Sequence, residues 1–190
     1  MKQIISYMLL LLVAILFDNC TKDNLNNNVK TPAITSNATI KNDAGNSNFV
    51  SNYHGLGKQT LWELQQARSA SARYRDIKNA IKDGYADINV VMPNMGYHYM
   101  KSSLADTIFD PGNPELLVYN KNEEGNFELL AVEYAVPIAL SPNAAPSGFT
   151  GSNDVWDHNT MFGLWLLHAW VWNYNSDGVF NPTNPLVVVR

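Results

Sequence analysis

The run MFGLWLLHAWVWNYN, residues 161–175, constrains the fold more than any other stretch of this chain. It is the most apolar and most tryptophan-rich segment, and it predicts a strand over residues 162–174. Side chains alternate along a strand, so His168 shares a row with Leu166 and Trp170, while Trp165 and Leu167 belong to the other row. Because both rows are apolar, we expect a sheet that is covered on both faces.

Three further strands are predicted before this one, at residues 95–101, 114–121 and 126–137. The tripeptide Glu-Glu-Gly at 123–125 indicates a hairpin turn, since glycine accepts a positive φ without strain. Residues 138–160 contain several Pro, Gly, Asn and Ser and are expected to form a long loop. The C-terminal residues 181–190 are expected to close the chain as a short edge strand.

One long amphipathic helix is predicted over residues 60–83, because apolar or small residues recur there at steps of three and four. Thr60 and Glu63 have capping-box spacing at its start, and Gly84 is placed to end it. The fold class is therefore α+β, with one long N-terminal helix packed on a curved antiparallel sheet of four to five strands. This order of elements is similar to that of cystatin-like and nuclear-transport-factor-like folds, and a small barrel is the alternative.

Three of the predicted strands each carry one polar group among apolar neighbours, namely His98, Glu133 and His168. Glu133 shares its predicted row with Phe127, Leu129, Ala131 and Ala135, where an ionised carboxylate needs a partner. Two imidazoles and one carboxylate are the ligand set of a mononuclear site for a divalent transition metal such as Zn, Fe, Mn or Cu. We expect such a metal to bind less tightly as the pH falls through the histidine range, and the predicted lining of the site is Tyr97, Tyr99 and Trp170.

Other interpretations of the same residues stay open. His98 and His168 could be core histidines bonded to backbone, and Glu133 could pair with Arg73 or Arg75 of the helix. His54 and His158 lie in Gly- and Asn-rich surroundings and are expected on the surface, with His158 as a reserve ligand from a loop.

The aromatic residues give a second functional hypothesis, a non-catalytic lipoprotein that binds a sugar or another small ligand. A third is an accessory subunit that docks a partner through exposed tryptophans. No Ser-His-Asp spacing, phosphate loop or dinucleotide fingerprint is present, and whether the protein is an enzyme stays open. The aromatic residues of the proposed pocket are Trp156, Trp165, Trp170, Trp172 and Tyr174.

The N-terminus resembles a bacterial lipoprotein signal. Lys2 precedes an apolar stretch over residues 4–17, which is long enough for a signal peptide and short for a membrane span. Cys20, the single cysteine, follows after Asp18 and Asn19, where such signals usually have two small residues. In such signals the cysteine is lipidated and becomes the mature N-terminus. The expected organisation is a signal peptide at 1–19, a lipidated cysteine with an Asn-rich tether at 20–48, and one globular domain at 49–190.

Charge and cysteine usage exclude several classes of protein. The formal net charge is −4 and the 13 Lys and Arg residues are scattered, so a nucleic-acid partner is not expected. One cysteine cannot make an intramolecular disulfide or a cysteine-rich zinc site. The expected location is the bacterial cell envelope, at the outer membrane or facing the periplasm, with the membrane reached through the N-terminal lipid.

Residues 72–185 resemble a family of uncharacterised secreted bacterial proteins. The family pattern runs approximately Met-Gly-x-His-Tyr, Pro-Glu-x-Leu-x-Tyr, Glu-Tyr-x-Val and Leu-His-Ala-Trp-x-Trp, then Asn-Pro-x-Gly-x-Phe. This chain has MGYHY, PELLVY, EYAV and LHAWVW, and it departs at residues 175–178, where it has Asn-Ser-Asp-Gly. The resemblance places His98, Glu133 and His168 on family motifs and implies a recurrent domain, and it implies no activity.

Overall fold

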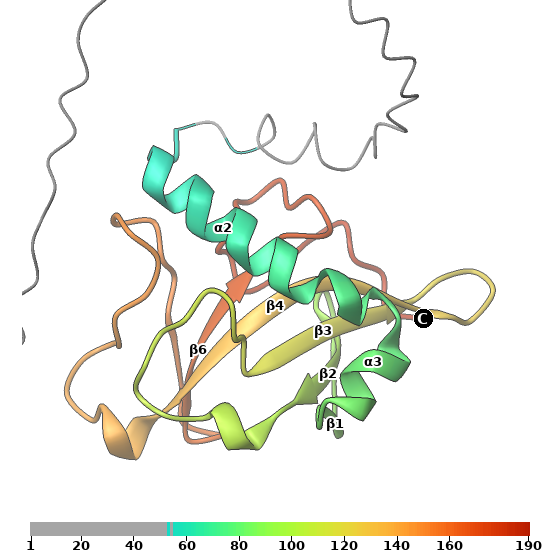
Figure 1. The fold of residues 1–190 in the computed structure, drawn as a ribbon, viewed down its shortest axis with the longest axis horizontal. Helices are drawn as coiled ribbons and strands as arrows, with labels where there is room; N and C mark the ends of the chain where they lie inside the picture. The colour runs from blue at the N-terminus through green and yellow to red at the C-terminus, as the bar shows by residue number, and fades with distance from the viewer. Residues whose placement is uncertain (1–52, 54) are drawn as a thin grey trace, which may run out of the picture. The chain divides into compact units, whose positions relative to one another are not determined.

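The structure is a computed structural model that describes Tyr53 and residues 55–190 (Figure 1). The predicted signal peptide, Cys20, the tether at 20–48 and His54 lie outside the described residues.

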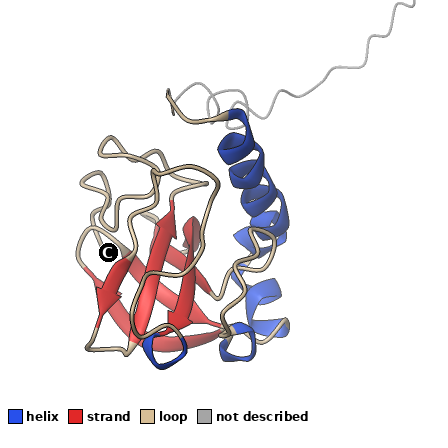
Figure 2. Ribbon diagram, turned by 90° about the vertical axis from the view of Figure 1, so that its left-hand side faces the viewer, coloured by secondary structure: helices blue, strands red, loops and turns tan. Residues whose placement is uncertain are grey.

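An antiparallel sheet forms the centre of the described chain. Its six strands pair in the order β1-β2-β3-β4-β6-β5. Every neighbouring pair is antiparallel, and the sheet is curved (Figure 2). The strands are β1 (Ala86–Met92), β2 (Gly96–Met100), β3 (Leu116–Lys121), β4 (Phe127–Pro137), β5 (Asp157–Asn159) and β6 (Leu164–Ala169).

The predicted α+β class with a curved antiparallel sheet is confirmed, but the strand count of four to five is wrong. β1 and β5 were not expected, and the described residues 181–190 form no strand. Instead, the C-terminal segment is held by side chains of the sheet. The Tyr97 hydroxyl donates to the Arg190 carbonyl at 2.6 Å, and the Asn120 amide donates to the Val188 carbonyl at 2.7 Å.

The predicted single helix over 60–83 is divided into three pieces. α2 (Lys58–Ser71) leads into a 3-10 turn, η1 (Ala72–Arg75), and then α3 (Ile77–Lys82). The break falls at Asp76, whose backbone is extended at φ −90° and ψ 108° and whose carboxylate accepts the Lys78 N–H at 3.0 Å. Asp76 therefore ends one helix and caps the next. Shorter 3-10 turns occur at η2 (Ser102–Leu104) and η3 (Ile138–Leu140).

The start of α2 also differs from the prediction. The helix begins after Gly57 and not at the N-terminus of the chain, and Thr60 and Glu63 do not form a capping box. The Thr60 hydroxyl donates to the Thr150 carbonyl at 2.6 Å, and the Glu63 carboxylate accepts the Thr150 backbone N–H at 2.7 Å. Both side chains therefore tie the first turns of α2 to the loop around residue 150.

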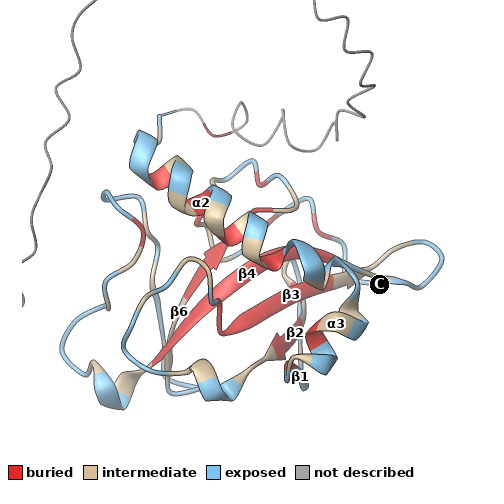
Figure 3. Cartoon of the chain, in the orientation of Figure 1, coloured by how far each residue is buried: buried red, intermediate tan, exposed pale blue. Residues whose placement is uncertain are grey.

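The helices cover one face of the sheet, and most buried residues lie between these two layers (Figure 3). Leu64 and Ala67 of α2 pack there with sheet residues such as Val132 and Leu167. The opposite face carries a smaller apolar cluster made of Val118, Leu130, Ala131, Trp170 and Val187. Both faces of the sheet therefore carry buried apolar residues, although no residue of β6 itself belongs to the smaller cluster.

A bulge in β4 changes which side chains share a face. Val118 pairs with Ala131 and Tyr119 pairs with Leu129, so Leu130 is an extra residue. Leu129 packs on the helix side, whereas Leu130 and Ala131 both join the opposite cluster. The predicted row that ran from Phe127 to Ala135 is therefore wrong on the N-terminal side of the bulge.

Candidate metal centre

The structure brings His98, Glu133 and His168 together on the face of the sheet opposite the helices. Glu133 of β4 stands directly across from His168 of β6, and their atoms Oε1 and Nδ1 are 3.3 Å apart. His98 lies two strands away on β2, with β3 between, and its Nε2 is 3.8 Å from Glu133 Oε2. The two imidazole rings are 6.1 Å apart and nearly perpendicular, at 88°.

This cluster could hold a metal ion. The three side chains are 4%, 1% and 3% exposed, and each offers one ligand atom within 4.8 Å of the others. Bonds of about 2.1 Å to a tetrahedral ion place ligand atoms about 3.4 Å apart. The 3.3 Å and 3.8 Å contacts of the two histidines are of this order but involve different oxygens of Glu133, so the side chains would have to draw closer around an ion. Among the residues that the structure describes, no other group of three His, Cys, Asp or Glu side chains meets this condition.

A bulge in β1 orients His98. Asp87 pairs with Tyr99 and Val91 pairs with Tyr97, so residues 88–90 all lie opposite His98. Asn89 takes a positive φ of 57° within this bulge. The bulge places the Val90 carbonyl 3.2 Å from His98 Nδ1, which donates its proton there. The lone pair of neutral His98 then lies on Nε2, the atom that faces Glu133, as is typical of histidines that bind metals.

His168 is held by its neighbour Trp170. The two rings stack at 14° with centroids 5.9 Å apart, and the Trp170 indole N–H donates to the Asn181 carbonyl at 2.7 Å. His168 Nε2 and Glu133 Oε2 are both buried, and neither has a hydrogen-bond partner among the described residues. Buried polar atoms are seldom left in this state, so the pair indicates room for a ligand.

Burial sets the protonation of the metal-free cluster. Burial, and to a smaller extent the electrostatic effect of Asp157, raise the pKa of Glu133 from 4.5 to about 8. Burial also lowers the pKa of His168 from 6.5 to about 3 and lowers that of His98, although the Val90 and Gly96 backbone partly opposes the change at His98. At neutral pH the acid is therefore protonated and both imidazoles are neutral, so the cluster is not an ion pair.

The ion pair of Glu133 with a helix arginine, one of the alternatives, is not formed. Arg73 pairs with Asp83 at 3.0 Å, and the Arg75 guanidinium lies over the Trp172 ring. Among the described residues, the basic side chains next to the Glu133 carboxyl are those of the two histidines, at 3.8 Å and 3.3 Å.

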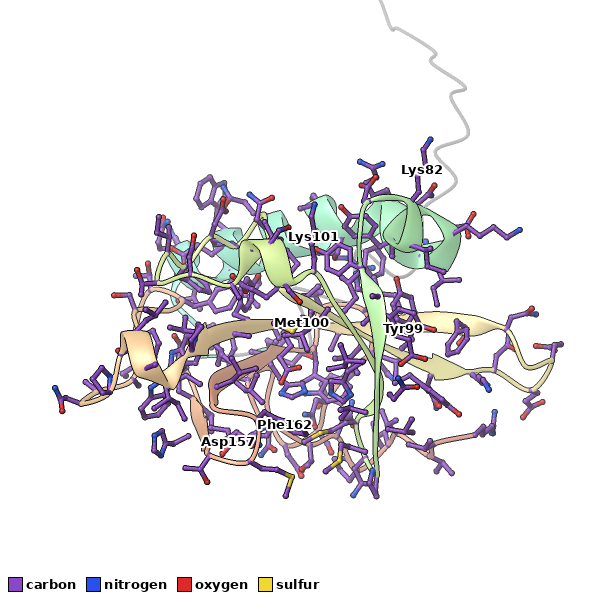
Figure 4. All side chains as sticks on the ribbon, turned by 90° about the horizontal axis from the view of Figure 1, so that it is seen from below. Lys82, Tyr99, Met100, Lys101, Asp157 and Phe162 are labelled. Atoms are coloured by element: carbon purple, nitrogen blue, oxygen red, sulfur yellow. The ribbon has the colours of Figure 1, made fainter. Side chains whose placement is uncertain are left out.

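A cavity of about 200 Å³ opens onto the cluster. Besides the three cluster residues, its polar lining is Asp157 and Asn159 of β5. Figure 4 shows Met100, Asp157 and Phe162 of this lining on the side of the sheet away from the helices. The rest of the wall is apolar and consists of Ile88, Val90, Met92, Met95, Met100, Leu116, Phe162, Leu164, Leu166 and Pro182.

The other residues predicted for the site lie elsewhere. Tyr97 and Tyr99 alternate with His98, so they point to the helix side and pack in the main core. Trp170 stacks on the His168 ring and is not among the residues that line the cavity. His158 is exposed and lies outside the cluster, with its ring tilted at 44° to that of Trp165 and the two centroids 4.4 Å apart.

Sequence reasoning missed the Val90 carbonyl and the residues of β1 and β5 that line the cavity. Residues 86–90 alternate between apolar and polar side chains, with Ala86, Ile88 and Val90 against Asp87 and Asn89, so a strand signal was present there and was not used. Asp157 next to His158 in the predicted loop was the one available signal for β5.

The fold and the cluster define an α+β protein with a buried His-His-Glu group beside an apolar cavity. No protein-family model, no curated protein and no solved structure matches this chain. The resemblance to a family of secreted bacterial proteins therefore stays a prediction. Among the residues that the structure describes, none of the helices combines the length and the apolar character that a membrane crossing requires.

Proposed function

We propose that this protein binds one divalent transition metal through His98, Glu133 and His168. The observation that carries the proposal is the buried cluster itself, in which a carboxylate oxygen and an imidazole nitrogen lack partners beside a cavity. Two histidines and one carboxylate suit Zn, Fe(II) or Mn, and imidazole also suits Cu.

The roles of the ligands follow from their surroundings. His98 would bind through Nε2, because its Nδ1 is engaged by the Val90 carbonyl. Glu133 would bind in its deprotonated form and so release a proton to solvent. Three protein ligands leave positions free toward the cavity, and a metal there could act as a Lewis acid or, if it is redox-active, in electron transfer to a bound molecule.

Metal content of the purified protein tests the proposal. We expect about one metal per chain in wild-type protein prepared without chelator and then supplied with Zn, Fe(II), Mn or Cu. The Glu133→Gln variant should lose most of that metal, since the amide is a poorer ligand than a carboxylate. A matched control is Glu115→Gln, because Glu115 is a second buried acid whose Oε2 accepts the Ala135 N–H at 3.2 Å outside the cluster. Metal well below one per chain in the wild type, or equal loss in both variants, would contradict the proposal.

The cavity also favours the second candidate, small-ligand binding without a metal. Its mostly aliphatic and thioether walls offer few hydrogen bonds, so an apolar molecule suits it better than a sugar, which carries hydroxyls all round. Two of the tryptophans expected to form a sugar platform are engaged elsewhere. Trp165 donates to the Ser141 carbonyl at 2.9 Å, and Trp172 donates to the Ser71 hydroxyl at 2.9 Å. Ligand binding that persists in chelator, in protein that never takes up metal, would favour this candidate.

We also propose that Cys20 anchors the domain to the cell envelope. The support is the sequence pattern alone, a lone cysteine that follows an apolar signal-like stretch after two intervening residues. Labelling with radioactive palmitate in a bacterial host should mark the wild type and not Cys20→Ala. No label on the wild type, or equal label on both proteins, would exclude the anchor.

A further inference from the structure

The cavity has a polar floor and an apolar wall, which limits what can occupy it. His98, Glu133 and His168 are buried at one end together with Leu116, which is 3% exposed. Ile88, Met92 and Phe162 are 37%, 40% and 42% exposed, so they form the mouth. An occupant must therefore present an apolar body to the wall and its polar group to the floor.

The volume sets the size of the occupant. Pockets for drug-sized ligands measure about 300–1,000 Å³, whereas a dry cavity of about 150 Å³ accepts benzene. The cavity of about 200 Å³ thus fits a single ring with one or two small substituents. The three methionines among its lining residues are flexible enough to adjust to such a ring.

The two buried atoms without hydrogen-bond partners indicate which polar group a ligand should carry. Glu133 Oε2 and His168 Nε2 are buried side-chain atoms that need one or two partners. A hydroxyl can donate one hydrogen bond and accept others, so it can satisfy both atoms, and its oxygen can also bind a metal held by the same residues. A carboxylate can only accept, and it would bring a negative charge into a desolvated site with Asp157 nearby.

We infer that the cavity binds a small apolar hydroxyl compound, a phenol or a molecule of similar size, with its hydroxyl on Glu133 and His168. The inference rests on the proposed function in taking the cluster as the polar end of the site. It adds the chemical class of the ligand and the direction from which it enters.

Fluorine NMR of three probes tests the inference, with 4-fluorophenol compared with fluorobenzene and 4-fluorobenzoate. We expect 4-fluorophenol to bind at least tenfold more tightly than either of the others, in the metal-loaded protein. Equal binding of fluorobenzene would show that the hydroxyl is not recognised, and tighter binding of 4-fluorobenzoate would show that an anion is preferred. Either result, or no binding of any probe, would overturn the inference.

A variant at the mouth locates the binding. Ile88→Trp should weaken 4-fluorophenol at least tenfold by filling the entrance, since the exposed position tolerates a larger side chain. Val91→Trp is the matched control, because Val91 is 44% exposed on the same strand and does not line this cavity. An unchanged affinity in Ile88→Trp, or equal losses in both variants, would place the probe elsewhere and refute the inference. One metal per chain without phenol binding would refute only the ligand, whereas phenol binding without metal uptake would refute only the metal.

Discussion

Replacing Glu133 by glutamine should stabilise the metal-free protein, and more so as the pH rises. The pKa of the Glu133 carboxyl is about 8 in the folded protein, and its ordinary value of 4.5 is expected in the unfolded chain. The folded state therefore binds the proton more strongly, and the free energy of unfolding falls as the pH rises from 4.5 through 8. Each pH unit in that window removes about 1.4 kcal/mol, up to a total of about 5 kcal/mol.

Glutamine keeps the shape of the protonated acid and does not titrate. The stability difference between Glu133→Gln and wild type should therefore widen by about 2 kcal/mol between pH 6 and pH 8. Urea unfolding in the presence of EDTA, followed by circular dichroism, measures it at each pH. Other titrating groups, such as Glu115, are common to both proteins and cancel in the difference.

Glu128→Gln provides the matched control, since Glu128 is exposed on the same strand. Its stability difference from wild type should be constant over the same pH range. The reasoning would be refuted if the Glu133→Gln difference were also constant to within about 0.5 kcal/mol, because the acid would then ionise as it does in the unfolded chain.

Three further outcomes follow from the same contacts. Metal affinity should fall about five- to sixfold from pH 8 to pH 7, because Glu133 takes up a proton over this range. Competing protons on two histidines of ordinary pKa would lower the affinity less than about twofold. Competition with a coloured chelator measures the affinity at each pH. Gly96→Ala should lower stability by more than about 3 kcal/mol in urea, since Gly96 has a φ of +125° and a Cβ would lie 2.1 Å from the Tyr119 carbonyl oxygen. Gly125→Ala, which also has a positive φ but meets nothing within 4 Å, should cost only about 1 kcal/mol. Trp170→Phe should keep a ring on His168 but lose the bond to the Asn181 carbonyl, which urea unfolding should register as a loss of about 1–2 kcal/mol.

The face that each polar group occupies could be predicted from the sequence. Alternation placed His168 in a row with Leu166, but Tyr97 and Tyr99, which alternate with His98, were expected to line the same site. The residues of the cluster were therefore found from strand periodicity alone, and the structure brings them together.

Register and backbone irregularity could not be predicted in the same way. Glu133 faces His168 because of the register between β4 and β6, and no local sequence pattern predicts that register. The bulge at Leu130 also depends on a distant part of the chain. The Leu130 carbonyl accepts hydrogen bonds from the backbone N–H groups of Trp172 and Asn173, more than forty residues later. The pH range of metal binding is also hard to predict from the sequence. Burial depends on the packing of the sheet, and it raises the pKa of Glu133 and lowers that of His168.

The two buried glutamates show why the cluster is better explained by binding than by folding. Glu115 is 5% exposed, and its carboxylate accepts a backbone N–H from the neighbouring strand, so it contributes to the packing of β4. Glu133 is 1% exposed, and its Oε2 is unpartnered beside an equally unpartnered His168 Nε2. Burial raises the pKa of both acids, to about 8 for Glu133 and about 7 for Glu115, so at pH 7 each lowers stability by about 3 kcal/mol relative to a group that does not titrate. The unpartnered oxygen is what distinguishes Glu133. A leucine would fill the same apolar surroundings without that loss, so folding alone gives no reason for the carboxyl, whereas a metal or a hydroxyl held at its free oxygen does.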